Sequence, residues 1–283
     1  MRIISGRINT SLGGISEIIS TRNEQALVRI ANEQIALGAQ AIDLNCATHL
    51  NTEIGDMIWM INTLQGSVDI ALGTDSPNPE LHKEALKIIR APRPIVNSIS
   101  LEMNRVQELA PYIKENNARL VILLHDETGM PKTAEDRIRI LPKVEKLMKD
   151  YELDFCDIFL DPLLFPIAFD EENAMTFIQT MNLIKKLEPR FSFICGMDNI
   201  SYTMPEMEIL NIAMMFMLAG NGMDAVMLSL TAKNASFIPA VHALTAQSDG
   251  VLDYIKFFRQ GKLNVLNNSI ELETAWLRSL NRG

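Results

Sequence analysis

The chain has 283 residues, 47% of them hydrophobic, and a formal net charge of -9 at pH 7. This acidity disfavours a nucleic-acid ligand, which needs a basic surface, and no apolar run reaches the ~18 residues that span a membrane. Three scattered cysteines without a C-x-x-C pair argue against a disulfide framework or a zinc site, so we expect a cytoplasmic protein without a bound metal.

Eight apolar runs follow one another from the first residues onward, so we expect no signal peptide. Half-exposed strands alternate between apolar and polar residues, whereas near-continuous apolar runs such as these predict buried parallel strands. Seven end on Asn or Asp, whereas the eighth ends near Ser229. The runs cover residues 2–9, 41–45, 68–75, 94–97, 120–126, 157–161, 191–199 and 225–230.

Helical patterns lie between the runs, as where Leu27, Ala31 and Ile35 recur along one face. The alternation predicts an α/β fold, a (β/α)8 TIM barrel that forms a single domain over residues 1–250, with a C-terminal helical extension over 251–283. Active sites of such barrels lie at the C-terminal ends of the strands. The Asn and Asp side chains are therefore expected to converge on one mouth.

Several loop residues allow two interpretations. Residues 10–14 contain two glycines and either let the backbone approach a ligand or form a simple turn. Asp75 either contacts a ligand or caps its own loop, and Lys132 either meets an anion or is solvated. His49 is expected to pack within its loop. Pro142 predicts a break in the helix that contains it.

The sixth strand places Asp161 before an apolar, proline-containing segment. A carboxylate there would be desolvated unless a donor paired with it, and a ligand rich in N–H groups would supply one. The helix expected after Pro205 carries methionines at helical spacing, which is typical of core packing: Met207, Met214, Met215 and Met217.

Common catalytic motifs are missing from the sequence. It has no G-x-S-x-G, no H-E-x-x-H and no P-loop, and no strand ends in a lysine that could form a Schiff base. Only two tryptophans occur, both on expected helices, so stacking faces for a sugar are scarce. Asp and Asn together suit a flat heterocycle with donors and acceptors, and a pterin has that pattern.

The strand ends carry a more specific resemblance over residues 1 to about 260. The chain resembles the pterin-binding methyltransferases that move a methyl group between methyltetrahydrofolate and the cobalt of a corrinoid protein. The segments that match are Gly-Arg-Ile-Asn9, Gly38-Ala-Gln-Ala-Ile-Asp-Leu-Asn45, Asp75-Ser, Asn97-Ser, Thr128-Gly-Met-Pro-Lys132, Asp161-Pro-Leu and Gly196-Met-Asp-Asn199-Ile-Ser201.

The resemblance implies roles for the strand-end residues. Asn199 would be catalytic, donating a hydrogen bond to the N5 atom that carries the methyl group. The pterin ring would be bound by Asp75, Asn97, Asp161, Gly196, Asp198 and Asn199, with Asn9, Asp43 and Asn45 behind them. Tetrahydrofolate or 5-methyltetrahydrofolate would be the substrate. A separate corrinoid protein would be the partner of a homodimer active in anaerobic one-carbon metabolism.

Two alternatives to this methyltransferase remain. A dihydropteroate synthase shares the barrel, but its Asn-Val-Thr-Pro-Asp-Ser-Phe loop, its Ser-Thr-Arg-Pro-Gly loop and its strand-end lysine are absent here. A non-catalytic folate-binding subunit is the other. The chain also departs from the methyltransferase pattern at Gly6, at Glu206-Met207 and at Ser229. The first two departures bear on how the folate tail is bound and on which corrinoid protein docks. The direction of methyl transfer stays open.

Overall fold

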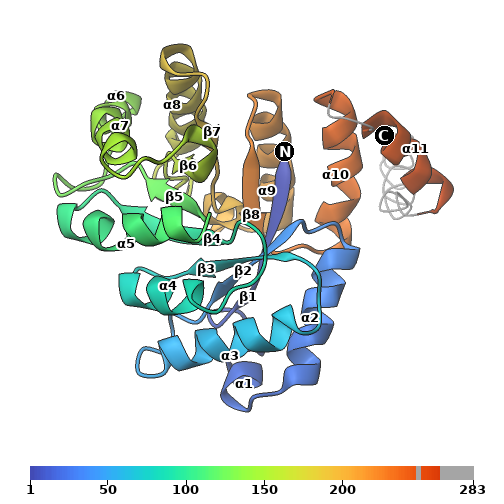
Figure 1. Ribbon diagram of the computed structural model, residues 1–283. Coiled ribbons are helices and arrows are strands. Elements are labelled where there is room, and N and C mark those ends of the chain that lie inside the picture. Colours follow the sequence, from blue (N-terminus) through green and yellow to red (C-terminus); the bar gives the residue numbers. More distant parts are fainter. Residues whose placement is uncertain (247–249, 262–283) are drawn as a thin grey trace, which may run out of the picture. The chain divides into compact units, whose positions relative to one another are not determined.

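Residues 1–246 and 250–261 are described by the structure, which is a computed structural model. Eight parallel strands form one sheet that curls into a nearly closed barrel, in the order β7-β6-β5-β4-β3-β2-β1-β8 (Figure 1). The TIM-barrel prediction is therefore confirmed. The strands are β1 (Arg2–Asn9), β2 (Ala41–Asn45), β3 (Ala71–Asp75), β4 (Ile95–Ser100), β5 (Arg119–Leu123), β6 (Ile158–Asp161), β7 (Ser192–Phe193) and β8 (Ala225–Leu228).

The barrel closes between its seventh and eighth strands through a single bridge. The N–H of Met227 donates to the carbonyl of Cys195 at 2.8 Å, and Gly196 pairs with Met227. The strand predicted over residues 191–199 is thus much shorter in the structure. After Gly196 the chain turns into a 3₁₀ helix, η2 (Met197–Ser201), because the N–H of Asn199 donates back to the Gly196 carbonyl at 3.3 Å.

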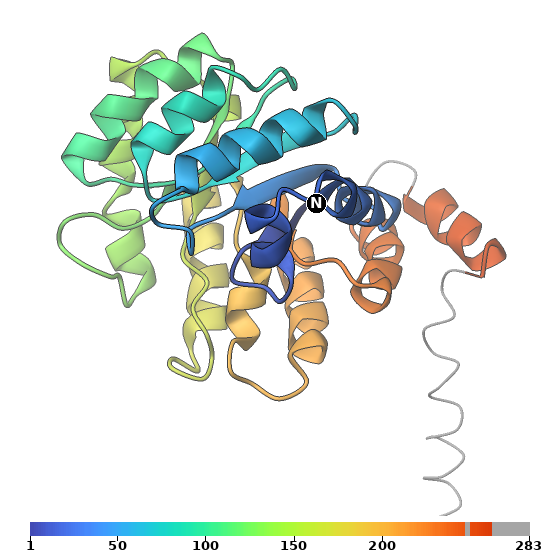
Figure 2. The ribbon, with the colours of Figure 1, turned by 90° about the horizontal axis from the view of Figure 1, so that it is seen from below.

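Helices follow the strands and lie around them in the first part of the chain (Figure 2). Asn78 caps α4 with its side chain and Pro79 is the first residue of this helix. The break predicted at Pro142 is also found, since one helix ends at Ile138 and the next begins at Leu141. These helices are α1 (Ile15–Ser20), α2 (Glu24–Ala36), α3 (Glu53–Gln65), α4 (Pro79–Leu86), α5 (Met103–Glu115), α6 (Ala134–Ile138), α7 (Leu141–Asp150), α8 (Asn173–Leu187) and α9 (Met207–Gly220), with a short 3₁₀ turn, η1 (Phe155–Asp157).

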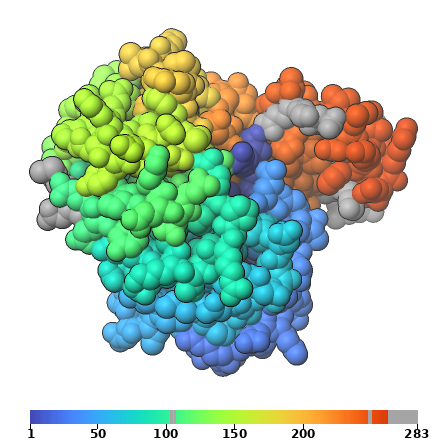
Figure 3. All heavy atoms as spheres, in the orientation of Figure 1, coloured from blue at the N-terminus to red at the C-terminus, as the bar shows by residue number. Residues whose placement is uncertain are grey.

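The barrel interior and the space between strands and helices are both apolar. Inward-facing side chains of six strands, among them Ile4, Val121 and Phe159, fill the interior together with Ile194. A second cluster lies between β1 to β3 and helices α1 to α4. Figure 3 shows side chains of α3 to α5, coloured blue to green, next to one another on this surface of the molecule. Strands buried on both faces explain the continuous apolar runs.

The chain divides into two compact units, Met1–Leu230 and Thr231–Gly283. The first contains the whole barrel, and the described part of the second consists of α10 (Ala232–Leu244) and α11 (Gly250–Arg259). The domain boundary predicted at residue 250 stays a prediction, and the part of the predicted C-terminal helical extension beyond residue 261 lies outside the described residues. None of the helices within the described ranges is both long and apolar enough to cross a membrane.

Candidate functional site

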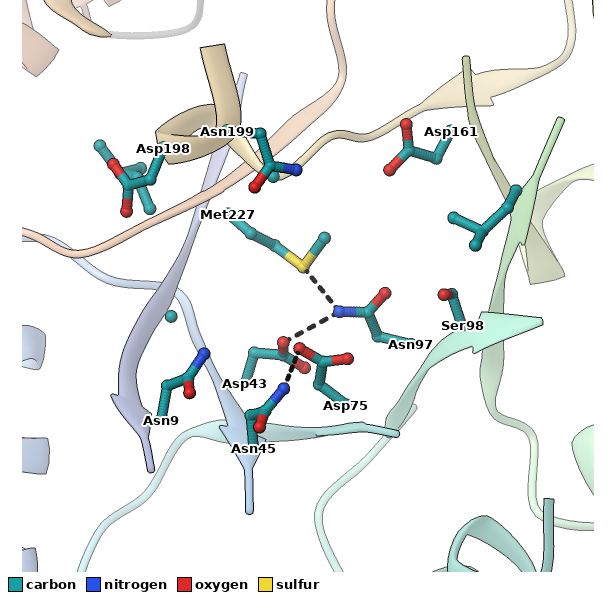
Figure 4. Close-up of a pocket in the computed structure, with 14 residues that line it drawn as sticks. Asn9, Asp43, Asn45, Asp75, Asn97, Ser98, Asp161, Asp198, Asn199 and Met227 are labelled. Atoms are coloured by element: carbon teal, nitrogen blue, oxygen red, sulfur yellow. Dashed lines mark hydrogen bonds between the residues drawn. The ribbon is translucent and has the colours of Figure 1, made fainter. Parts of the chain in front are cut away.

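A cavity of about 260 Å³ opens at the C-terminal ends of the strands (Figure 4). It brings together all nine residues that the sequence singles out. Asn199 and Asp161 lie on one side of it, opposite the group formed by Asp43, Asn45 and Asp75 (Figure 4). The nine lining residues are Asn9, Asp43, Asn45, Asp75, Asn97, Asp161, Gly196, Asp198 and Asn199.

Strand register places three of these side chains next to one another. Asn45 of β2 pairs with Asp75 of β3, which in turn pairs with Asn97 of β4. The side chain of Asn45 donates to Asp75 Oδ2 at 2.7 Å. The other oxygen of Asp75 has no partner among the described residues and is left for a ligand.

The amide of Asn97 has both of its hydrogens engaged. Nδ2 donates to Asp43 Oδ2 at 3.0 Å and to Met227 Sδ at 3.2 Å. Asn97 therefore offers only its carbonyl oxygen to a ligand. Asp43 Oδ1 is buried and has no partner among the described residues. A Cβ on Gly73 would come within 2.6 Å of this oxygen, so glycine is needed there to leave Asp43 its room.

Burial changes the protonation of these carboxyl groups. Burial raises the pKa of Asp75 to about 6. The hydrogen bond from Asn45 opposes this increase, and repulsion from Glu53 adds to it. Burial and the neighbouring Asp75 raise the pKa of Asp43 well above its usual range. A low-polarity site disfavours the charged form of each carboxyl group until a donor pairs with it.

The loop behind Asp75 is held by a buried histidine that the sequence did not bring to attention. His82 is completely buried, and its two ring nitrogens contact Thr74 Oγ1 and the Ser76 carbonyl, each at 2.8 Å. Burial lowers the pKa of His82 to about 4, so the ring is neutral. The residues on either side of Asp75 are fixed in this way.

Asp161 lies across the cavity from Asp75, on the side of Asn199 (Figure 4). Its Oδ1 accepts the N–H of Leu163 at 2.7 Å, and burial raises its pKa to about 7. The completely buried Arg137 lies behind it and donates to the Pro162 carbonyl at 2.6 Å and to the Thr133 carbonyl at 3.1 Å. Its positive charge favours the ionised form of Asp161. The helical position of Arg137 gave no sign of this role.

The turn after β7 presents Asn199 to the cavity. The Asn199 side chain is exposed and makes no hydrogen bond to any described residue. A Cβ on Gly196 would lie 3.1 Å from Asn199 Nδ2, so glycine there gives the amide freedom. Asp198 holds the turn, because its two oxygens accept Asn211 Nδ2 and the N–H of Ser229, both at 2.9 Å.

Some strand-end residues do not reach the cavity, contrary to the expectation that all would converge there. Asp126 has a completely buried side chain, paired with Lys143 at 2.7 Å, because β5 already ends at Leu123 and the chain turns away. Ser229 lies outside too. Asn9 does line the cavity, but its Oδ1 accepts the N–H and hydroxyl of Ser11.

The cavity also contains lining residues that the sequence did not single out. They are Gly6, Ser98, Leu123, Met227 and Leu228. Met227 could have been found, because it lies near the C-terminal end of the eighth apolar run, as the predicted site residues do in the other runs. The others carry no polar group that marks them, apart from Ser98 beside Asn97.

Known proteins resemble this chain both in sequence and in fold. The chain is 27% identical over 266 residues to the methylcorrinoid:tetrahydrofolate methyltransferase of Eubacterium limosum, covering 93% of this chain and 98% of that protein. The fold resembles a dihydropteroate synthase of Clostridium difficile, solved with pteroic acid, with a TM-score of 0.68 and 19% identity over 86% of this chain and 96% of the other.

A second dihydropteroate synthase, from Yersinia pestis, has a TM-score of 0.61 at 13% identity, over 87% of this chain and 93% of the other. At such identities the likeness concerns the fold alone. Residues 5–229, which include nearly all of the barrel and every residue of the cavity, match the family described as pterin binding enzyme. The chain therefore belongs to the pterin binding enzyme family.

Proposed function

We propose that this chain is a methyltransferase that moves a methyl group between N5 of tetrahydrofolate and the cobalt of a separate corrinoid protein. The observation that carries the proposal is the opposition of a carboxylate-rich wall and the freely placed amide of Asn199 across one cavity. The oxygens of this wall can accept hydrogen bonds from a pterin ring, and the amide can donate one to the reacting nitrogen N5.

The ring would be bound by acceptors. Asp75, Asn97 and Asp161 each keep one side-chain oxygen without a partner among the described residues. A reduced pterin carries a 2-amino group and ring N–H groups that donate to such oxygens. Asp43 and Asn45 would act from behind, by orienting Asn97 and Asp75. Asp198 and Gly196 would act by placing the Asn199 turn.

Asn199 would act on N5. When the N5–methyl bond breaks, the nitrogen keeps the electron pair, and a donor aimed at that pair stabilises the transition state more than the ground state. The amide can do this because no described residue competes for its hydrogens. In the reverse direction N5 must use the same pair to attack the methyl group, so the amide must be able to move away.

The cavity is poorly suited to the alternative, dihydropteroate synthase chemistry. That reaction releases pyrophosphate, which requires cationic partners. Among the residues that line the cavity in the described part of the chain none is Lys or Arg, whereas four are Asp. A polyanion there would meet like charge, at a cost of several kcal/mol. The full-length similarity to a methylcorrinoid:tetrahydrofolate methyltransferase supports the same choice.

The test is a titration of the protein with tetrahydrofolate and 5-methyltetrahydrofolate, followed by single-turnover spectra with cob(I)alamin under strictly reducing conditions. We expect binding of both folates and conversion of the cob(I) absorption band to that of methylcob(III)alamin. Comparison with the reverse reaction assigns the direction. Condensation of a pterin pyrophosphate with p-aminobenzoate would establish the synthase instead, and folate binding without methyl transfer to free or protein-bound corrinoid would leave a binding subunit.

A further inference from the structure

A second cavity, of about 300 Å³, lies at the opposite end of the barrel. It is lined by the first residues of consecutive strands, including Arg2 of β1, Ala41 of β2 and Arg119 of β5. Arg93, just before β4, and Gln40, just before β2, complete its polar rim. All of these residues begin strands or precede them, so they meet at the N-terminal ends of the strands. The proposed folate cavity lies at the C-terminal ends, on the other side of the barrel.

The guanidinium groups at this end have few acceptors. The side chains of Arg2 and Arg119 donate no hydrogen bond to any described residue, and Arg119 instead lies over the ring of Phe159 at 5.4 Å. Arg93 donates to Asp157 Oδ1 at 2.7 Å and to the Cys156 carbonyl at 2.8 Å.

Nevertheless the Nε atoms of both Arg93 and Arg119 are buried without a partner in the described structure. A buried donor that lacks an acceptor costs free energy, of the order of 1–3 kcal/mol, so convergent donors of this kind favour an anion.

Charge supports the same conclusion. No Asp or Glu stands among the lining residues of this cavity within the described chain, although the whole protein is acidic. Burial lowers the pKa of Arg119 to about 10, and the positive charges of Arg2 and Arg93 add to this effect. Cations that repel one another in a concave, partly buried site are stabilised by an anion of two or more charges.

We propose that this N-terminal cavity, formed by Arg2, Arg93, Arg119 and Gln40, is a binding site for a phosphate group. Guanidinium forks match the oxygens of phosphate, and the volume admits either the free ion or a phosphate ester. The site is independent of the folate cavity and of the reaction proposed there.

Isothermal titration calorimetry with inorganic phosphate, at constant ionic strength, tests the proposal. We expect saturable binding of one phosphate per chain, and affinity at least about tenfold weaker in Arg119→Gln and in Arg2→Gln, since each removes charge-assisted hydrogen bonds. A parallel titration with adenosine monophosphate distinguishes the source, because tighter binding of the ester assigns an esterified phosphate and tighter binding of phosphate assigns the free ion.

Arg29→Gln is the matched control, because the Arg29 side chain is 71% exposed on α2 and its one ion pair among the described residues is with Glu33, at 3.8 Å. It should bind phosphate as the wild type does. Arg2 is exposed, so its variant decides the matter should Arg119→Gln fail to fold. Absence of saturable phosphate binding in the wild type, or unchanged affinity in the Arg2 and Arg119 variants, would overturn the proposal.

Discussion

Asn199 is the residue to which the proposed function assigns a part in methyl transfer but little part in folate binding. It is held at the cavity by backbone contacts of the η2 turn rather than by its own amide. We expect Asn199→Ala to bind tetrahydrofolate with nearly unchanged affinity and to lower the rate of methyl transfer about 10²–10³-fold, the usual cost of one transition-state donor.

Folate titration and single-turnover absorbance measure the two quantities separately. Asn62→Ala, an exposed position on α3, is the control. Methyl transfer by Asn199→Ala at the wild-type rate would contradict the role of the amide.

Carboxyl protonation should make folate binding at the proposed site depend on pH. Asp161 and Asp75 have pKa values raised by burial to about 7 and about 6, so both are increasingly protonated as the pH falls through that range. The ionised groups are the better acceptors for pterin N–H groups. Folate affinity should therefore weaken from about pH 8 to about pH 5.5.

Calorimetric titrations across this range measure the effect. Asp161→Asn should bind folate more weakly at pH 8 and lose the component of the profile near pH 7. A folate affinity that does not vary with pH would show that these carboxyl groups do not accept hydrogen bonds from the N–H groups of the pterin ring.

At the scale of elements, the loop between β5 and α6 depends on Asp126. Burial alone would raise the pKa of Asp126, but hydrogen bonds from Lys143, Thr128 and Arg139 hold it below its usual value. We expect Asp126→Asn to lower the free energy of unfolding by about 1–3 kcal/mol, because charged hydrogen bonds are lost at a buried side chain. Urea unfolding at pH 7 measures this.

The same variant has a characteristic pH dependence. A carboxyl group whose pKa is depressed by folding stabilises the protein above its unfolded pKa and loses that effect as the pH falls through the folded value. The difference between wild type and Asp126→Asn should therefore shrink in acid. Asp150→Asn removes only an exposed pair with Lys146 and should change stability by less than about 1 kcal/mol. Equal changes in the free energy of unfolding in Asp126→Asn and Asp150→Asn would contradict the prediction that the buried Asp126 contributes more to stability than the exposed Asp150.

At the scale of the whole molecule, we expect a homodimer. The resemblance to the methyltransferases implies one, and α11 exposes Leu252, Ile255 and Phe258, which are 56%, 40% and 70% exposed. Exposed apolar side chains on one helix favour association. Light scattering should give about twice the chain mass of 31.7 kDa, and Leu252→Glu with Phe258→Glu should lower it. A monomer mass that stays constant with concentration would exclude the dimer.

The order of the elements and the residues at the mouth could be read from the sequence. Apolar runs that end in Asn or Asp are a local pattern, and parallel strands necessarily bring such ends to one side of a barrel. All nine predicted site residues line the cavity for this reason. The same rule failed at Asp126, because the point at which β5 ends depends on its pairing with neighbouring strands.

Only the tertiary structure decided which polar groups are free to act. Asn97 contacts Met227, 130 residues away, and so presents an oxygen rather than an amide hydrogen. Arg2, Arg93 and Arg119 stand on separate segments, and nothing in the local sequence indicates that the barrel gathers them at its other end. Periodicity is a property of neighbours in the chain, whereas hydrogen-bond partners and burial are set by neighbours in space. The sequence therefore determined the barrel and its mouth, and the fold determined the chemistry that each residue there offers.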